Sequence, residues 1–330
     1  MNEKAPLVSV VVPNYNYARY LDARLSSILN QTFQDFELIL LDDASTDNSL
    51  EVLDRYKDDP HVSHFVVNEQ NTGSPFKQWM KGILLAKGEW VWIAEADDLC
   101  EPTFLEICMH YINMESNVTI CNTGSVYIDT EDNIMKGKVY QWEKNENKAG
   151  AICFDGKKFA EYILYWKNDI PNASGVLEYA LNIHNKKWTD FRYCGDWLFW
   201  FEMAMQGKVI QIYQTLNYFR QHQSQTAKGK YNGQNFIESF KIGIYIEKKI
   251  PTINHFKRMQ KHGRDARIIK HIKNKEIRES IIKDYKKYFH SSFIKDYLYY
   301  KLNRHFHAIP KVLTEEKDRK KALKYSKILS

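Results

Sequence analysis

An apolar run, WVWI at positions 90–93, passes directly into the acidic run AEADDL at positions 94–99. Gly88 precedes it, and a short run of β-branched and aromatic residues bounded by glycine and by charge is typical of a buried strand in a parallel sheet. Ligands of open α/β sheets bind beyond the carboxyl ends of such strands. Glu95, Asp97 and Asp98 therefore stand at a predicted ligand-binding edge.

These carboxylates have two interpretations. Carboxylates that lie close together repel one another unless a cation joins them, and Mg²⁺ and Mn²⁺ prefer oxygen ligands. A divalent metal that holds a substrate diphosphate is the first hypothesis. The second is that Asp97 and Asp98 begin a loop and cap the helix that follows Pro102. This stretch by itself leaves both open.

Three further strands are predicted before this one, at residues 7–12, 36–41 and 62–67. Apolar residues at helical spacing separate the four strands, and this alternation predicts a doubly wound α/β fold around a parallel sheet. Later strands are expected at residues 118–120, 125–128 and 209–212, and a surface loop at residues 131–148.

Polar residues follow three of the four strands, at Pro13–Tyr15, Asp42–Asp43 and Glu95–Asp98. The carboxyl ends of parallel strands share one edge, so these residues are expected to line one pocket. This convergence favours the functional interpretation of the acidic run. The sequence contains neither G-x-G-x-x-G after the first strand nor G-x-x-x-x-G-K-[ST], so a metal is the expected means of holding phosphate.

The 330-residue chain has an ordinary globular composition, with 44% hydrophobic and 27% charged residues. Its charge is uneven: residues 251–330 carry 22 Lys and Arg against 8 Asp and Glu, whereas residues 1–250 carry 25 against 33. Five cysteines without a C-x-x-C pair predict neither a disulfide framework nor a zinc site, and a cytoplasmic location is expected. We expect no membrane span and no signal peptide.

Six motifs follow one another along residues 7–100: VSVVVPNYN at 8–16, SSILNQTF at 26–33, LDDASTD at 41–47, NTGS at 71–74, AKGE at 86–89 and EADD at 95–98. In this order they resemble the family 2 glycosyltransferases. The resemblance implies the GT-A fold, a Rossmann-like and mostly parallel sheet flanked by helices. It also implies transfer of a sugar with inversion of configuration.

The resemblance implies roles for five residues. Pro13 and Tyr15 would lie along the nucleotide, and Asp43 would accept a hydrogen bond from its base. Asp97 would lie near the ribose and diphosphate. Asp98 would ligate a Mn²⁺ or Mg²⁺ ion, in keeping with the D-x-D-D metal motif that EADD resembles.

The residues themselves sharpen some of these roles and leave others open. Alternation along a strand sends Asp42 and Asp43 to opposite sides, so one of them can face the nucleotide. Glu95 holds the first acidic place of the motif, where it would contact the metal, the diphosphate or the acceptor, or shape the loop. The third helix lacks the A-R-N-like run of many relatives, which leaves open whether Lys77 or Lys81 neutralises phosphate.

The run GDWLFW at residues 195–200 is the second chemical motif. Asp196 precedes an apolar helix, and its default role is the N-cap. A glycosyl transfer also needs a general base that deprotonates the acceptor hydroxyl. The family places this base in an E-D or G-D pair at a helix start, which Gly195-Asp196 matches. Asp196 can cap and catalyse, and Trp197 and Trp200 would contact the acceptor sugar.

Two later segments resemble parts of the same family. Residues 171–177, PNASGVL, resemble the segment below the acceptor, although a plain loop-to-strand passage explains them equally well. Residues 216–226 resemble a Y-R-x-H-x-x-S segment. There Arg220 would offset phosphate charge or contact the acceptor, and His222 would ligate the metal or touch the diphosphate. An ordinary core or surface histidine is the alternative for His222.

Beyond residue 230 the resemblance fades, and apolar residues recur at helical spacing among Lys and Arg. This pattern predicts two or three basic amphipathic helices. They would dock on the catalytic body, attach to the anionic inner face of the cell membrane, or mediate a homodimer. The predicted organisation is a catalytic domain at 1–230, divided at residue 100 into nucleotide and acceptor halves, and a helical C-terminal region at 231–330.

Residues and resemblance together predict an inverting, metal-dependent glycosyltransferase with no nucleic-acid partner. Its donor would be a nucleotide sugar, expected to be a UDP-sugar, and its acceptor a glycan or lipid-linked glycan in bacterial surface polysaccharide synthesis. A sugar-phosphate nucleotidyltransferase would use a similar sheet, but the chain lacks a G-x-G-x-x-[TR]-like phosphate loop near its first strand. A non-catalytic polyanion-binding protein that acts through the basic C-terminal region is the second rival.

Overall fold

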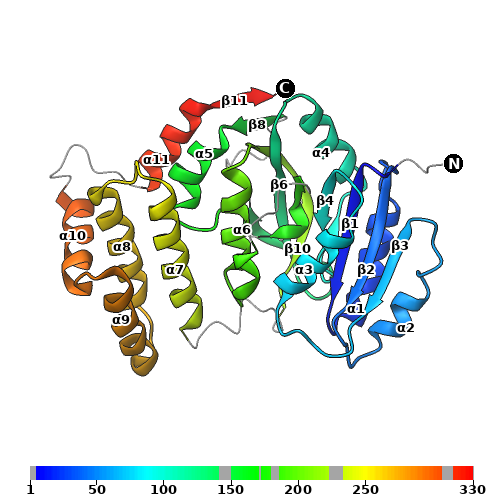
Figure 1. The fold of residues 1–330 in the computed structure, drawn as a ribbon, viewed down its shortest axis with the longest axis horizontal. Coiled ribbons are helices and arrows are strands. Elements are labelled where there is room, and N and C mark those ends of the chain that lie inside the picture. The colour runs from blue at the N-terminus through cyan, green and yellow to red at the C-terminus, as the bar shows by residue number, and fades with distance from the viewer. Residues whose placement is uncertain are drawn as a thin grey trace.

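The computed structural model describes residues 5–140, 150–170, 172–179, 186–222, 233–306 and 315–329. They form an α/β protein around one sheet of eleven strands (Figure 1). The strand order is β11-β8-β10-β6-β9-β4-β1-β2-β3, with β5 paired to β10 and β7 paired to β6. The predicted fold class, a mostly parallel central sheet flanked by helices with a helical C-terminal extension, is confirmed.

The first half of the sheet is parallel and has its connecting helices between the strands. Its elements are β1 (Val8–Asn14), α1 (Ala18–Leu29), β2 (Phe36–Asp42), α2 (Ser49–Asp54), β3 (Val62–Val67), α3 (Pro75–Leu85) and β4 (Trp90–Ile93). β1 pairs in parallel with β2 and β4, and β2 with β3. Val11 packs into one core cluster, and Val10 and Val12 into the cluster on the other face. Apolar residues at successive positions of β1 therefore bury both faces of the sheet, as a parallel sheet requires.

The second half of the sheet mixes strand directions. It contains β5 (Leu99–Cys100), α4 (Phe104–Asn113), β6 (Val118–Ile128), β7 (Ile134–Tyr140), β8 (Ala151–Phe154), α5 (Gly156–Phe159) with a π-helical turn (Ala160–Leu164), 3₁₀ turns (Ala173–Gly175 and Lys187–Asp190), β9 (Val176–Tyr179), α6 (Gly195–Ala204) and β10 (Lys208–Arg220). β6 is one strand where two were expected. Residues 134–140, which were expected in a surface loop, form β7 and pair with β6, so the predicted loop is wrong for these residues. Residues 141–149 lie outside the described part.

One reversal of direction matters for the site. β9 runs antiparallel to its neighbours β4 and β6. The start of β9 consequently lies at the edge where β4 ends. The residues immediately before β9, 172–175, are thereby brought beside the acidic run that follows β4.

The C-terminal region packs beside the sheet and then returns to it. Helices α7 (Gln234–Lys249), α8 (His255–Lys270), α9 (Lys275–Phe289) and α10 (Phe293–Phe306) lie beyond α6 in Figure 1. The chain then returns through α11 (Glu315–Ala322) and a 3₁₀ turn (Leu323–Tyr325) to β11 (Ser326–Leu329), which pairs antiparallel with β8. These helices therefore dock on the catalytic body, and the final strand, which the sequence patterns did not predict, extends the central sheet. Within the described residues, no helix has the length and apolarity needed to cross a bilayer.

Candidate active site

The carboxyl edge of the parallel strands brings the predicted polar residues together. Asn14 ends β1 opposite Asp42, which ends β2, and Asn14 Nδ2 donates to Asp42 Oδ2 at 2.7 Å. The Ser45 amide and hydroxyl also donate to Asp42, at 2.8 and 2.7 Å, so this fully buried carboxylate fixes the turn after β2. Pro13 is buried within β1, whereas Tyr15 beyond it is 44% exposed. The edge therefore offers an exposed aromatic ring beside polar strand ends.

Asp43 has partners distinct from those of Asp42. Its Oδ1 accepts from Asn68 Nδ2 at 2.7 Å and from Gln78 Nε2 at 2.8 Å. Its Oδ2 accepts from the Thr72 hydroxyl at 2.8 Å, and the Thr72 amide lies 3.0 and 3.1 Å from the two oxygens. The two neighbouring aspartates thus face separate surroundings, as strand alternation predicts. Gln78 of α3 therefore helps to hold Asp43 in place.

The two candidate phosphate-binding lysines are both on α3. Lys81 Nζ lies 2.5 Å from Asn68 Oδ1, and Lys77 Nζ lies 3.4 Å from the Thr72 carbonyl oxygen. Both ammonium groups are therefore beside the residues that surround Asp43. In this arrangement they add positive charge beside Asp43.

Asp98 is held by two donors from distant parts of the chain. Its Oδ1 accepts the Arg220 backbone amide and its Oδ2 accepts Asn172 Nδ2, both at 2.9 Å. Just 1% of the residue is exposed. Burial, followed by the neighbouring charge of Asp97, raises the pKa of the Asp98 carboxyl above its usual range. A nearby cation would stabilise the ionised form of this carboxylate.

Asp97 lies next to the histidine that the sequence analysis proposed as a metal ligand. His222 Nε2 lies 2.8 Å from Asp97 Oδ2. Arg220 Nε donates to the Asp97 carbonyl at 2.6 Å, while its other nitrogens reach the Asp129 carbonyl at 2.8 Å and the Asp132 carboxylate at 2.5 Å. Arg220 is 1% exposed and therefore braces the backbone of the acidic run from within the fold.

Two tyrosines of α1 and its start enclose His222. The Tyr17 ring meets the imidazole edge-on with centroids 5.4 Å apart, and the Tyr20 ring lies 5.7 Å away. The Arg220 guanidinium stacks 4.5 Å from the Tyr20 centroid. Burial, then the charge of the acidic run, raises the pKa of the Tyr17 hydroxyl, so Tyr17 stays neutral at physiological pH.

Glu95 is joined to α3 and to the segment before β9. Its Oε1 accepts the Trp79 indole N–H at 2.8 Å, and its backbone amide donates to Ser174 Oγ at 3.0 Å. Burial, with the charges of Asp97 and Asp98, raises the pKa of the Glu95 carboxyl to about 8. Trp79 was not among the predicted site residues; its signal in the sequence was its place on the third helix, which lacks the A-R-N-like run of many relatives.

Asp196 lies in the first turn of α6, where Cys194 is the N-cap. The expectation that Asp196 itself caps the helix is wrong. Its Oδ1 accepts the Trp197 amide at 2.8 Å and its Oδ2 accepts Asn168 Nδ2 at 2.7 Å. The pKa of the Asp196 carboxyl is raised to about 7, mainly by burial. The charge of Glu238 on α7 also raises this pKa, whereas the hydrogen bonds from Trp197 and Asn168 act in the opposite direction. A carboxyl with a pKa near 7 is suited to general-base chemistry.

The two tryptophans after Asp196 are core residues in this structure. Trp197 is buried and its indole N–H donates to the Leu164 carbonyl at 2.7 Å, with Lys261 Nζ 5.6 Å from its ring. Trp200 is fully buried. Both rings therefore anchor α6 against the fold, and Trp200 has no exposed surface with which to stack on a sugar.

The segment on either side of residue 171 contacts both acidic groups. Asn168, just after the π-helical turn, reaches Asp196, and Asn172 reaches Asp98. Ser174 reaches the backbone of Glu95. Residues 171–177 were predicted near the acceptor through the family resemblance, whereas Asn168 was not predicted. Its signal in the sequence was a polar Asn-Asp pair after an aromatic run. Residue 171 lies outside the described part.

The residues of the acidic run fit a hard divalent cation. Among the described residues there is no ready-made group of three or more His, Cys, Asp or Glu ligands. Mg²⁺ is usually bound by one or two carboxylates, with waters and substrate phosphates as the remaining ligands, so an open set is suitable. Each oxygen of Asp98 accepts one hydrogen bond and keeps a second lone pair. The donor chemistry of Asp97, Asp98 and His222 therefore suits Mn²⁺ or Mg²⁺.

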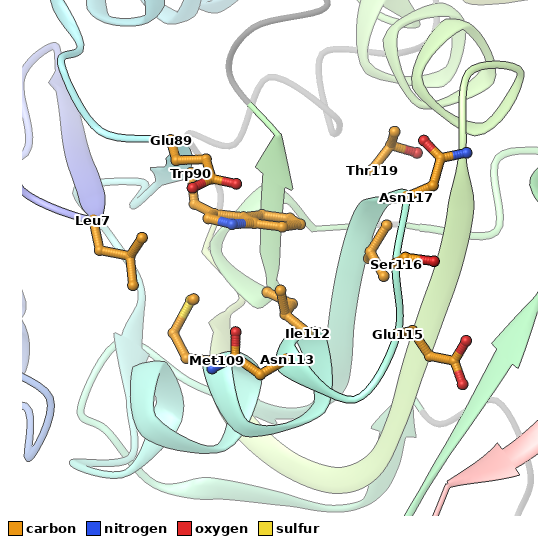
Figure 2. A pocket seen from close by; sticks show the side chains of 11 residues that line it. Leu7, Glu89, Trp90, Met109, Ile112, Asn113, Glu115, Ser116, Asn117 and Thr119 are labelled. Carbon is orange, nitrogen blue, oxygen red and sulfur yellow. The ribbon is translucent and has the colours of Figure 1, made fainter.

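A separate hollow lies at the opposite edge of the sheet. Its volume is about 580 Å³, and Figure 2 shows Trp90 and Thr119 on its walls, at the start of β4 and near the start of β6. Leu7 and Asn113 also line it. Because Leu7, Trp90 and Thr119 lie at or next to the starts of β1, β4 and β6, the hollow is remote from the carboxyl edge. Its lining includes none of the predicted site residues.

Comparisons with known proteins agree with this architecture. Residues 9–166 match the family model described as glycosyl transferase family 2. An uncharacterized glycosyltransferase of Haemophilus influenzae is 28% identical over 286 residues, which is 83% of this chain and 81% of that protein. The chondroitin synthase of Escherichia coli is 30% identical over 161 residues, 48% of this chain and 23% of that protein. The crystal structure of S. aureus TarS 1–349 in complex with UDP-GlcNAc has a TM-score of 0.54 at 17% identity, and covers 94% of this chain and 78% of that chain.

The fold and the acidic strand end define a glycosyltransferase with a GT-A fold. The match to the glycosyl transferase family 2 model, at residues 9–166, includes β2, β3, β4 and all of β1 except Val8.

Proposed function

We propose that this protein is an inverting, metal-dependent glycosyltransferase that moves a sugar from a UDP-sugar to a glycan or lipid-linked glycan in bacterial surface polysaccharide synthesis. The observation that carries the proposal is that Asp98 and Asp196 are held by two asparagines four positions apart in the chain. Asn168 donates to Asp196 at the start of α6, and Asn172, four positions onward in the chain, donates to Asp98 at the end of β4. A donor-binding group and a base belong close together in a direct displacement.

The donor nucleotide lies along the ends of β1 and β2 in this proposal. Tyr15 presents an exposed ring, and Pro13 lies beside it in β1. Asp43, already oriented by Gln78 and Thr72, is placed to accept a hydrogen bond from the base. Asp97 faces the ribose and diphosphate. The UDP-GlcNAc complex of TarS, which shares the fold, supports UDP as the nucleotide.

The metal is Mn²⁺ or Mg²⁺, with Asp98 as the principal ligand and His222 beside it. When bound, the cation supplies positive charge that stabilises the departing diphosphate. Arg220 holds the Asp97 carbonyl and the backbone beneath both carboxylates, so its part is to orient the acidic run. Glu95, fixed by Trp79, faces the diphosphate or the acceptor.

Asp196 acts as the general base. Its carboxylate takes the proton of the acceptor hydroxyl as that oxygen forms a bond to the anomeric carbon. The bond from the anomeric carbon to the diphosphate oxygen breaks at the same time, and its electron pair leaves with the nucleotide diphosphate. Attack opposite the leaving group inverts the configuration. Asn168 and the Trp197 amide stabilise the ionised carboxylate before the proton is taken.

The proposed location is the cytoplasm, with peripheral contact to the inner face of the membrane. Support comes from the basic C-terminal region and from three apolar residues on α10, Ile294, Leu298 and Leu302, which are 68%, 47% and 55% exposed. Their spacing of four residues sets them on one face of the helix. Acidic phospholipid is the chemistry that such a face with neighbouring lysines fits. A homodimer also stays a prediction.

A donor screen tests the proposal. The purified full chain is mixed with Mn²⁺ and individual UDP-sugars, and a donor that binds the native state is expected to raise its melting temperature. Glycan acceptors are then added and released UDP is measured. In a parallel mixture of UTP and a sugar 1-phosphate, release of pyrophosphate would assign a nucleotidyltransferase. Stabilisation by a polyanion without any nucleotide effect would assign a binding protein.

A further inference from the structure

We propose that the C-terminal helix α11 is a positioning element for the transfer reaction, in which Arg319 clamps the segment that holds both Asp196 and Asp98. The inference rests on the proposed function, because it assigns a role to a residue far from the chemistry. It concerns neither donor nor acceptor binding directly. The physical basis is a chain of short contacts that leads from α11 to the two carboxylates.

Two asparagines with the same local geometry form the active-site end of this chain. Asn168 Oδ1 accepts the amide of Ile170 at 3.1 Å, and Asn172 Oδ1 accepts the amide of Ser174 at 2.6 Å. Such side-chain bonds to the backbone two residues onward fix the orientation of the amide group. Each Nδ2 is thereby aimed outward, Asn168 toward Asp196 at 2.7 Å and Asn172 toward Asp98 at 2.9 Å.

Asp169 ties this segment to α11. Its side chain is 2% exposed, and its Oδ2 receives Arg319 Nη2 at 2.6 Å. Burial raises the pKa of the Asp169 carboxyl, and the charge of Arg319 works against that rise. Lys167 is farther away, with Nζ at 3.6 Å from Oδ1. A buried carboxylate that loses its main cation is strongly destabilised where it stands, so removal of Arg319 is expected to move Asp169 and its neighbours.

The preceding residue of α11 secures the other side of the segment. Asp318, fully buried, accepts the Trp166 indole N–H at 3.0 Å and pairs with Lys257 Nζ of α8 at 2.6 Å. Successive residues of α11 therefore hold positions 166 and 169, and position 168 between them holds Asp196. Small displacements of a catalytic group are enough to cost large factors in rate, because reacting atoms must meet at defined distances.

The test compares the full-length Arg319→Gln, Arg319→Lys and Asn168→Ala variants with wild type. Arg278→Gln is the matched control, because Arg278 on α9 bonds the Ile272 carbonyl and not the segment. We expect Arg319→Gln to lower kcat at least about tenfold with an unchanged KM for the donor. Arg319→Lys should recover part of the loss. A double variant combines Arg319→Gln with Asn168→Ala. If Arg319 acts through Asn168, the fold-loss in kcat of this double variant should be smaller than the product of the two single fold-losses.

Hydrogen exchange supplies a readout that does not depend on turnover. Amides within residues 166–176 should exchange faster in Arg319→Gln than in Arg278→Gln, while the stabilisation by UDP and Mn²⁺ persists. Unchanged exchange in this segment overturns the inference whether or not the enzyme turns over. Equal kcat in Arg319→Gln and Arg278→Gln, or losses that multiply independently, would also overturn it. Failure of wild type to transfer any sugar would count against the proposed function, and the exchange result would still decide the clamp.

Discussion

Replacement of Asp196 by asparagine removes the proposed base with almost no change in shape. General-base catalysis contributes about 10²- to 10⁴-fold, or roughly 3–5 kcal/mol of the barrier, so kcat should fall by that factor. The structure also predicts a small stability cost. Asp196 accepts from two donors, the Trp197 amide and Asn168 Nδ2, and an amide side chain has one oxygen to offer. The side-chain amide of Asn168 cannot rotate by 180° to compensate, because its Oδ1 accepts the hydrogen bond of the Ile170 amide. One unmade hydrogen bond costs about 1 kcal/mol or somewhat more.

The assay is UDP release from the donor, with and without acceptor, between pH 5.5 and 9. With a pKa of about 7, the ionised fraction of Asp196 rises about tenfold from pH 6 to pH 8, and the wild-type rate should rise with it. Asp196→Asn should lose this acid limb and keep its stabilisation by UDP and Mn²⁺. Asp190→Asn, which changes an exposed carboxylate in the 3₁₀ turn before α6, is the control and should behave as wild type. A variant Asp196→Asn within threefold of the wild-type rate, or a flat wild-type profile, would refute the base assignment.

Four further outcomes follow from the contacts. Asp98→Ala should lose most of the activity and its dependence on Mn²⁺, as measured by metal titration. Full Mn²⁺-dependent transfer in this variant would contradict the metal assignment. Gly195→Ala should lower the melting temperature by several degrees, because a Cβ at Gly195 would lie 2.4 Å from the Trp188 carbonyl oxygen, and overpacking costs about 1–3 kcal/mol. A Cβ at Gly243, within α7, would have no atom within 4 Å, so Gly243→Ala should be neutral or stabilise the fold by about 0.5–1 kcal/mol. A calorimetric melting temperature that is lower for Gly243→Ala than for Gly195→Ala would refute the packing argument. Leu298→Glu should weaken flotation with vesicles of acidic phospholipid while transfer to a soluble acceptor is unchanged, and equal flotation would exclude this face from membrane contact.

Local patterns were sufficient for the first half of the fold. Runs of β-branched residues separated by amphipathic helices determine a parallel sheet, because continuous apolar strands must be covered on both faces. From that sheet the common edge of Tyr15, Asp43 and Asp98 follows, since parallel strands end on the same side. The opposite directions of Asp42 and Asp43 follow from the two-residue period of a strand.

The sequence by itself thus determined the α/β class, the edge at which the acidic run lies and the helical nature of the C-terminal region. The tertiary structure decided which residues surround those carboxylates. Asn168 and Asp196 are 28 residues apart, Asn172 and Asp98 are 74 apart, and Arg319 and Asp169 are 150 apart. No local pattern encodes such pairs, because they depend on the reversed direction of β9 and on the return of α11 and β11 to the sheet. The same packing decided that Trp197 and Trp200 are buried and that Cys194, not Asp196, caps α6.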